Sequence, residues 1–119
     1  MNKRMNEFVL IFRMDITTKE AQPTPEQMGK YMKQWGKWIN DIAHQNRLAE
    51  GGNHLSTEGR VLRPNNTISD RPYTEKMESV AGYIIIKAAN FDEAVDIAKD
   101  CPILQGKGTS VEVRKIETI

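Results

Sequence analysis

Two continuous apolar runs constrain this fold more than any other feature of the sequence. Phe8–Phe12 and Tyr83–Ile86 are rich in β-branched and aromatic residues, which is typical of strands in the middle of a sheet. The side chains of a strand point alternately to its two faces, so a sheet built on these runs is apolar on both faces. Helices that cover one face leave the other wet, at a cost of ~1.5–3 kcal/mol for each large side chain. The sheet therefore needs a cover on both faces.

A long amphipathic helix is predicted from Pro25 to about Asn46. It has a start signal in Thr24, Pro25 and Gln27, because the threonine caps the helix and the glutamine side chain reaches back to close a capping box. Seven apolar residues fall on one face of this helix. They are Met28, Tyr31, Met32, Trp35, Trp38, Ile39 and Ile42.

A second helix and a final strand follow the second apolar run. Asn90 caps this helix, Glu93 is its expected capping-box partner, and Pro102 stops it. Thr109–Ile116 alternates apolar and charged residues, which is the period of a half-buried strand.

The middle of the chain carries weaker signals. Gly51-Gly52 is interpreted as the end of a turn, and His54–Leu62 as a weak hairpin around Glu58-Gly59. Pro64–Asn66 is interpreted as a loop.

The order of elements is strand, helix, two strands, helix, strand. In 119 residues this order predicts an α+β ferredoxin-like βαββαβ sandwich, an antiparallel sheet with two helices on one face. A second copy is the economical cover for the other face, so we predict a homodimer through that sheet face. In the alternative, the excursion from His54 to Met77 folds over it.

Composition limits partners and compartment. Lys and Arg number 17 against 16 Asp and Glu, which argues against nucleic acid as a partner. One cysteine excludes an intrachain disulfide and makes a cysteine-based zinc site implausible. The basic start Met1–Arg4 precedes an apolar run too short for a signal peptide or a membrane span. We therefore expect a cytoplasmic protein without a membrane partner.

Several residues are expected to serve packing. Trp35 and Trp38 share the apolar helix face and are interpreted as core rather than as a stacking platform. Gly29 and Gly36 cost up to ~1 kcal/mol each relative to alanine inside a helix, so we expect a close neighbour there. Cys101 falls on the apolar face of the second helix and is expected to be a small buried hydrophobe.

The two histidines are candidates for acid–base chemistry, because imidazole exchanges protons near neutral pH. His44 falls on the polar side of the first helix and is expected to be solvated. His54 follows the two glycines and is either a functional group near a sheet end or a plain loop residue. No cluster has the spacing of metal ligands, so we predict neither a metal nor a cofactor.

The segment Ser69–Glu75 holds a dense set of polar groups around a rigid proline. As a functional loop it would lie at the end of the sheet and line the main cleft; as a structural one it would be a solvated turn. Its candidate groups are Asp70, Arg71, Tyr73 and Glu75.

Five motifs in series resemble the YCII-related proteins of the DGPF type. The resemblance covers nearly the whole chain, so residues 1–119 are interpreted as one such domain. It implies a ferredoxin-like fold that forms a dimeric α/β barrel. The motifs are Asp70-Arg71-Pro72-Tyr73-Thr74-Glu75, Gly82-Tyr83, Phe91-Asp92-Glu93-Ala94, Cys101-Pro102 and Gly108-Thr109-Ser110-Val111-Glu112-Val113-Arg114.

The resemblance also implies relatives that act on small aromatic or lactone substrates and others that resemble parts of sigma-factor-like regulators. In the enzymes a His–Asp pair associated with the first helix is expected. Here Gln27 or Met28 stands at the histidine position, and His44 lies near the aspartate position. Arg71 replaces the glycine of the family motif.

Two function hypotheses follow. The first is a homodimer that binds a small molecule, in a ligand-binding or regulatory role, with Arg71, Tyr73 and Glu75 as ligand-binding residues. Arg71 would pair with an anionic ligand. The alternative is an isomerase-like or lyase-like acid–base enzyme acting on a small organic substrate. In it Asp70 is the base, and His54 or Tyr73 is the acid or orients the substrate.

Overall fold

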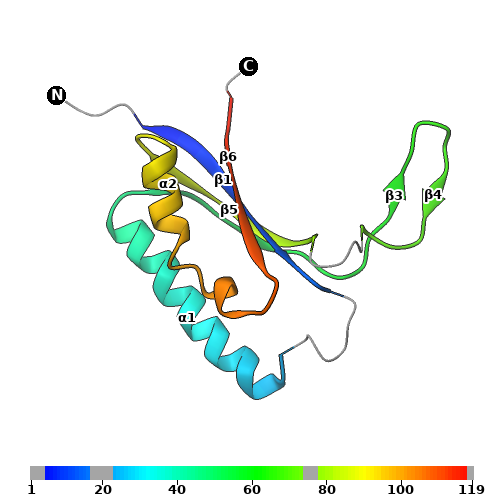
Figure 1. Cartoon of the computed structure of the whole chain (residues 1–119), viewed down its shortest axis with the longest axis horizontal. Helices are drawn as coiled ribbons and strands as arrows, with labels where there is room; N and C mark the ends of the chain where they lie inside the picture. Colours follow the sequence, from blue (N-terminus) through cyan, green and yellow to red (C-terminus); the bar gives the residue numbers. More distant parts are fainter. Residues whose placement is uncertain (1–4, 17–22, 74–77, 118–119) are drawn as a thin grey trace.

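The computed structural model describes residues 5–16, 23–73 and 78–117. Four strands form one antiparallel sheet in the order β2-β5-β1-β6, and two helices pack on it, as predicted for a ferredoxin-like α+β fold (Figure 1). The sheet strands are β1 (Asn6–Met14), β2 (Leu48–His54), β5 (Ser79–Ala88) and β6 (Ser110–Lys115). The helical elements are α1 (Pro25–His44), α2 (Phe91–Ala98) and the short 3-10 helix η2 (Pro102–Gln105).

Both helices begin at the predicted caps. The Thr24 hydroxyl accepts a hydrogen bond from the Gln27 N–H at 3.2 Å, and the Gln27 side chain accepts one from the Thr24 N–H at 3.0 Å. At α2 the Asn90 side chain accepts from the Glu93 N–H at 2.9 Å. The Glu93 carboxylate accepts from the Ala89 N–H at 3.4 Å, one residue before the expected partner. These bonds satisfy N–H groups that a helix leaves unpaired at its first turn.

The hydrophobic core lies between the sheet and the helices. Only the C-terminal half of α1 reaches it, through Trp38 and Ile42. Met28 and Met32 lie on the same predicted apolar face, yet they are 43% and 50% exposed. The N-terminal half of α1 therefore does not close onto the sheet. The buried core consists of Phe8, Leu10, Phe12, Trp38, Ile42, Ile84, Ile86, Ala88, Ala94, Ala98 and Cys101.

The sheet face away from the helices carries an apolar centre. We call it the open face, and at its centre Val9, Ile11, Tyr83 and Ile85 are all partly exposed. Within the excursion 54–77, the part from 61 to 69 stands apart from the sheet (Figure 1). It therefore does not provide the cover that the alternative required, and the homodimer stays a prediction.

The interpretation of Gly51-Gly52 as a turn is wrong, because both glycines lie inside the edge strand β2. The register of β2 against β5 shifts twice, between Leu48 and Glu50 and between Glu50 and Asn53. Gly52 has a φ of 65°, and a Cβ there would meet the carbonyl of the neighbouring strand. The glycines mark a bulged strand that approaches its neighbour closely, a pattern that sequence reasoning confused with a turn.

The predicted hairpin over His54–Leu62 is also wrong in its position. The accessory hairpin consists of β3 (Val61–Leu62) and β4 (Ile68–Ser69), and the segment Pro64–Asn66, predicted as a loop, forms its turn. We call the range Arg60–Arg71 the arm.

Two packing predictions have opposite outcomes. Cys101 is buried in the core, as expected, and its burial raises the pKa of the thiol to about 12, partly offset by a backbone hydrogen bond from Ile103. The expected close neighbour of Gly29 and Gly36 is absent, since a Cβ at either glycine would meet nothing within 4 Å in the described chain.

Candidate functional site

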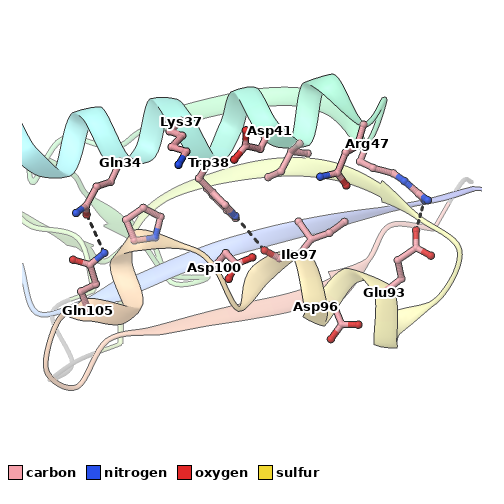
Figure 2. Close-up of a pocket in the computed structure, with 13 residues that line it drawn as sticks. Gln34, Lys37, Trp38, Asp41, Arg47, Glu93, Asp96, Ile97, Asp100 and Gln105 are labelled. Carbon is pink, nitrogen blue, oxygen red and sulfur yellow. Dashed lines mark hydrogen bonds and ion pairs between the residues drawn. The ribbon is translucent and has the colours of Figure 1, made fainter.

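The surface of the described residues is hollowed between α1 and α2 and again beside the N-terminal half of α1. The interhelical groove between α1 and α2 has a volume of about 620 Å³ (Figure 2). Three bridges cross between the elements that line it. The bridges are Gln34 to Gln105 at 2.9 Å, the ion pair of Arg47 with Glu93, and the Trp38 Nε1–H to the Ile97 carbonyl at 3.1 Å.

The second hollow, which we call the sheet-end cavity, has a volume of about 350 Å³. It lies where the N-terminal half of α1 leaves the sheet, and its walls come from β1, α1, β2, β5, η2 and residues next to these elements. Its lining is mostly apolar and includes three methionines and three aromatic rings. The apolar lining residues are Phe12, Met14, Ile16, Pro23, Met28, Tyr31, Met32, Trp35, Leu55, Ala81, Pro102 and Ile103.

Trp35 is held rigidly in the wall of this cavity. Its ring packs edge-to-face on Phe12, with centroids 4.7 Å apart, and on Trp38, with centroids 5.6 Å apart. On another side it contacts the imidazole of His54, whose centroid lies 5.9 Å away. Trp38 is core, as predicted, whereas Trp35 both packs on the core and presents its ring to the cavity.

Few charged or titratable groups line the sheet-end cavity. His54 comes from the end of β2, Asp15 from the end of β1 and Lys107 from the turn before β6. Asp15 is buried, while His54 is exposed. Gln27 also lines the cavity, but its side-chain oxygen is engaged in the cap of α1. The cavity therefore offers a largely apolar surface with an imidazole, a carboxylate and an amine at defined places.

The wall formed by η2 and the turn after it is fixed by Thr109. The Thr109 hydroxyl lies 2.5 Å from the Ile103 carbonyl and 3.0 Å from the Gly106 carbonyl. This arrangement ties the turn that carries Lys107 to η2, so the cavity is preformed on this side.

The structure does not bring the predicted site residues together. His54 lines the sheet-end cavity, but Asp70, Arg71 and Tyr73 line neither hollow and lie at the C-terminal base of the arm. The Asp70 carbonyl accepts from the Arg60 guanidinium at 2.9 Å. The role of Asp70 as a base and the ligand-binding roles of Arg71 and Tyr73 stay predictions, and these residues would act outside both hollows.

Two further predictions concern other parts of the chain. Glu75 lies outside the described residues. His44 is exposed near the end of α1, as expected for a solvated residue.

No group of three or more His, Cys, Asp or Glu among the described residues is placed to hold a metal ion. None of the described helices is long and apolar enough to cross a membrane.

Sequence reasoning missed most of the cavity. Asp15 carries one recognisable signal, since it is a carboxylate directly after an apolar strand. Lys107 lies between two glycines, a pattern typical of a turn, and this pattern gives no sign that the side chain lines a cavity. The apolar lining carried no signal distinct from core, because Met28 and Met32 obey the same helical period as Trp38.

The family model described as the YCII-related domain matches residues 8–117, nearly the whole chain. No curated protein matches the sequence.

Proposed function

The chain belongs to the YCII-related domain family, and we propose that it binds a small, largely apolar organic molecule in the sheet-end cavity. One observation carries this proposal. At about 350 Å³ the cavity is at the small end of ligand sites, and its wall is apolar with a few convergent polar groups. Three methionines in that wall can adapt to the shape of a ligand, because their side chains are flexible and polarizable.

The position of the cavity supports the proposal independently. Gln27 or Met28 stands where the family resemblance places a functional histidine, and both residues line this cavity. His54 reaches the same cavity from a different element, the end of β2. The interhelical groove, by contrast, is bridged by its own side chains.

The test uses 8-anilinonaphthalene-1-sulfonate, a dye whose fluorescence rises in apolar sites. Met32 lines the cavity from α1, and the neighbouring Lys33 is exposed and lines neither hollow. We expect saturable binding by the wild type, loss of that binding in Met32→Trp because the indole fills the cavity, and retention in the matched control Lys33→Trp. Equal dye binding by the two variants would show that the cavity is not the binding site.

A second candidate function is acid–base catalysis on the bound molecule. It is favoured by His54, whose imidazole lines the cavity against Trp35, because histidine is the side chain that most often serves as a general acid or base. Molecules that raise the melting temperature would be incubated with the protein in D2O and examined by proton NMR. Catalysis predicts exchange of an acidic C–H of one binder, and His54→Gln should abolish the exchange while the binder still stabilises the protein. Binding without any exchange leaves the first function standing and rejects the second.

We also propose that the protein acts as a homodimer through the open face. The partly exposed apolar centre of that face supports this arrangement, because a sheet is stable when both of its faces are covered. Charged residues lie beside the centre, and Arg13 of β1 pairs with Glu112 of β6 at 2.9 Å. Sedimentation velocity at tens of micromolar should show a dimer, and a monomer at that concentration would reject the proposal.

A further inference from the structure

Thioether sulfurs from two elements that are far apart in the sequence meet at the sheet-end cavity. Met28 and Met32 line the cavity from α1, and Met14 lines it from the last position of β1. Among the described residues one further methionine occurs, Met5, and it lines neither hollow. Three of the four described methionines therefore lie around one space of about 350 Å³.

The helix and the sheet both direct these side chains toward that space. Met28 and Met32 are four residues apart in α1, and at this spacing the Cβ atoms lie about 5–6 Å from each other. On β1, side chains two residues apart share a face, so Met14 shares the face of the buried Phe12, which the helices cover. A methionine side chain has three rotatable bonds, so the three sulfurs can approach a common point within the cavity.

Solvent reaches the two helix methionines, since Met28 is 43% and Met32 50% exposed. At this exposure each side chain gains only part of the burial energy that an apolar residue can supply, and leucine would supply about the same. The thioether distinguishes methionine from leucine at these positions, because its sulfur is a soft metal ligand. The exposure leaves both sulfurs accessible to an ion from solution.

The kind of donor indicates which metal the cavity would take. Thioether sulfur is soft and uncharged, and soft sulfur ligands select Cu(I), whereas carboxylate and carbonyl oxygens suit Mg²⁺, Ca²⁺ and Mn²⁺. Among the described lining residues, Asp15 carries a carboxylate and Lys107 an ammonium group. Their formal charges cancel, so the lining has no net charge that would repel a monovalent cation.

We propose that Met14, Met28 and Met32 form a binding site for Cu(I) in the sheet-end cavity. The prediction of no metal from the sequence rested on the spacing of metal ligands such as His, Asp and Glu, and that pattern does not include thioethers. The inference goes beyond the small-molecule function proposed above and does not depend on it. The metal needs the three sulfurs, whereas an apolar molecule needs only the apolar wall.

The first test locates the ligands in the wild-type chain. The protein is labelled with ¹³C at its methionine methyl groups, and one equivalent of Ag(I), a redox-stable analogue of Cu(I), is added as the nitrate in chloride-free buffer. Proton–carbon NMR should show the methyl signals of Met14, Met28 and Met32 shifted, and that of Met5 unchanged. A spectrum in which any of the three cavity methionines keeps its signal overturns the site.

The second test measures affinity for Cu(I) itself. Bicinchoninate, a chelator that forms a coloured Cu(I) complex, competes anaerobically with the protein for the metal. The double variant M28L/M32L keeps the side-chain volume and removes two sulfurs. Loss of an outer-shell partner typically costs 10–100-fold in metal affinity, so loss of two ligands should raise the Kd for Cu(I) by roughly tenfold or more. An unchanged Kd in the double variant overturns the proposal.

Two matched controls exclude other soft ligands. Met5 is 38% exposed, and Met5→Leu should keep the wild-type Kd for Cu(I). Cys101 is buried and does not line the cavity, so Cys101→Ala should also keep it. A Kd raised tenfold by either control would place the metal elsewhere and overturn the site.

The dye experiment described above separates this inference from the small-molecule function. M28L/M32L should still bind 8-anilinonaphthalene-1-sulfonate, because leucine preserves the apolar wall. A wild type that binds the dye in the cavity but does not compete for Cu(I) overturns the metal site alone. A wild type that binds Cu(I) through the three methionines but does not bind the dye overturns the small-molecule proposal alone.

Discussion

Ile84 and Ile85 are adjacent residues of β5 with the same side chain and opposite surroundings. Ile84 is 2% exposed and faces the helices, whereas Ile85 is partly exposed on the open face. Aspartate at either position adds one carboxylate and removes one apolar side chain. The two variants therefore test whether the two faces of the sheet differ as the structure shows.

The expected costs are far apart. Ile84→Asp loses the burial of a whole side chain and leaves a cavity, at ~2–5 kcal/mol, and it also buries a carboxylate without a partner, at several kcal/mol more. The sum approaches the ~5–15 kcal/mol that stabilises a typical domain, so this variant should not fold. Ile85→Asp loses only part of a side chain's burial and some strand preference, together ~1–2 kcal/mol. For a chain of this size that lowers the melting temperature of the protomer by about 5–10 °C.

Circular dichroism melts at low micromolar concentration, paired with sedimentation velocity, would measure both effects. Ile84→Asp should show no cooperative transition. Ile85→Asp should melt cooperatively and sediment as a monomer at concentrations where the wild type is a dimer. If the two variants melt within a few degrees of each other, the difference between the faces is not what sets the stability of this sheet.

Three further predictions concern single residues. Gly36→Ala should raise the free energy of unfolding by ~0.5–1 kcal/mol in urea melts, because the glycine touches nothing that a methyl group would meet; a loss would reveal a neighbour at that helix face. Thr24→Ala should lower it by ~0.5–2 kcal/mol, and Thr24→Ser, which keeps the hydroxyl, should restore most of the loss. The pKa of the Cys101 thiol is raised from 9.0 to about 12, so the folded chain holds its proton where the unfolded chain has lost it. Stability should therefore fall as the pH rises from about 9 toward about 12, and Cys101→Ala should fall less in urea melts at pH 8 and about 10.5.

The sequence predicted the elements whose signals are local. The Thr24 and Asn90 caps each determine a helix start through hydrogen bonds to residues three positions away. The apolar runs predicted the two central strands. The strand β2 was missed because its glycines serve the approach to β5, about thirty residues later, and no local pattern records that contact.

The cavity was less accessible to sequence reasoning than the fold. Helical periodicity places Met28 and Trp38 on one face, but it does not tell where along α1 the sheet ends. The position at which α1 extends beyond the edge of the sheet determines which of these residues is in the core and which lines the cavity. His54 was a candidate because a histidine near a sheet end can act as an acid or a base, whereas Lys107 carried no comparable signal.

The register of β1 has a consequence for how the chain is made. β1 is synthesised before the other three strands of the sheet, yet one of its two neighbours is β6, which is synthesised last. In this pair Phe8 lies opposite Lys115. Until β6 has been synthesised, one edge of an apolar strand has no partner, and such an edge is open to pairing with other chains. Completion of the sheet is thus a late event during synthesis, and a nascent chain held before residue 110 should depend on a chaperone to stay free of aggregation.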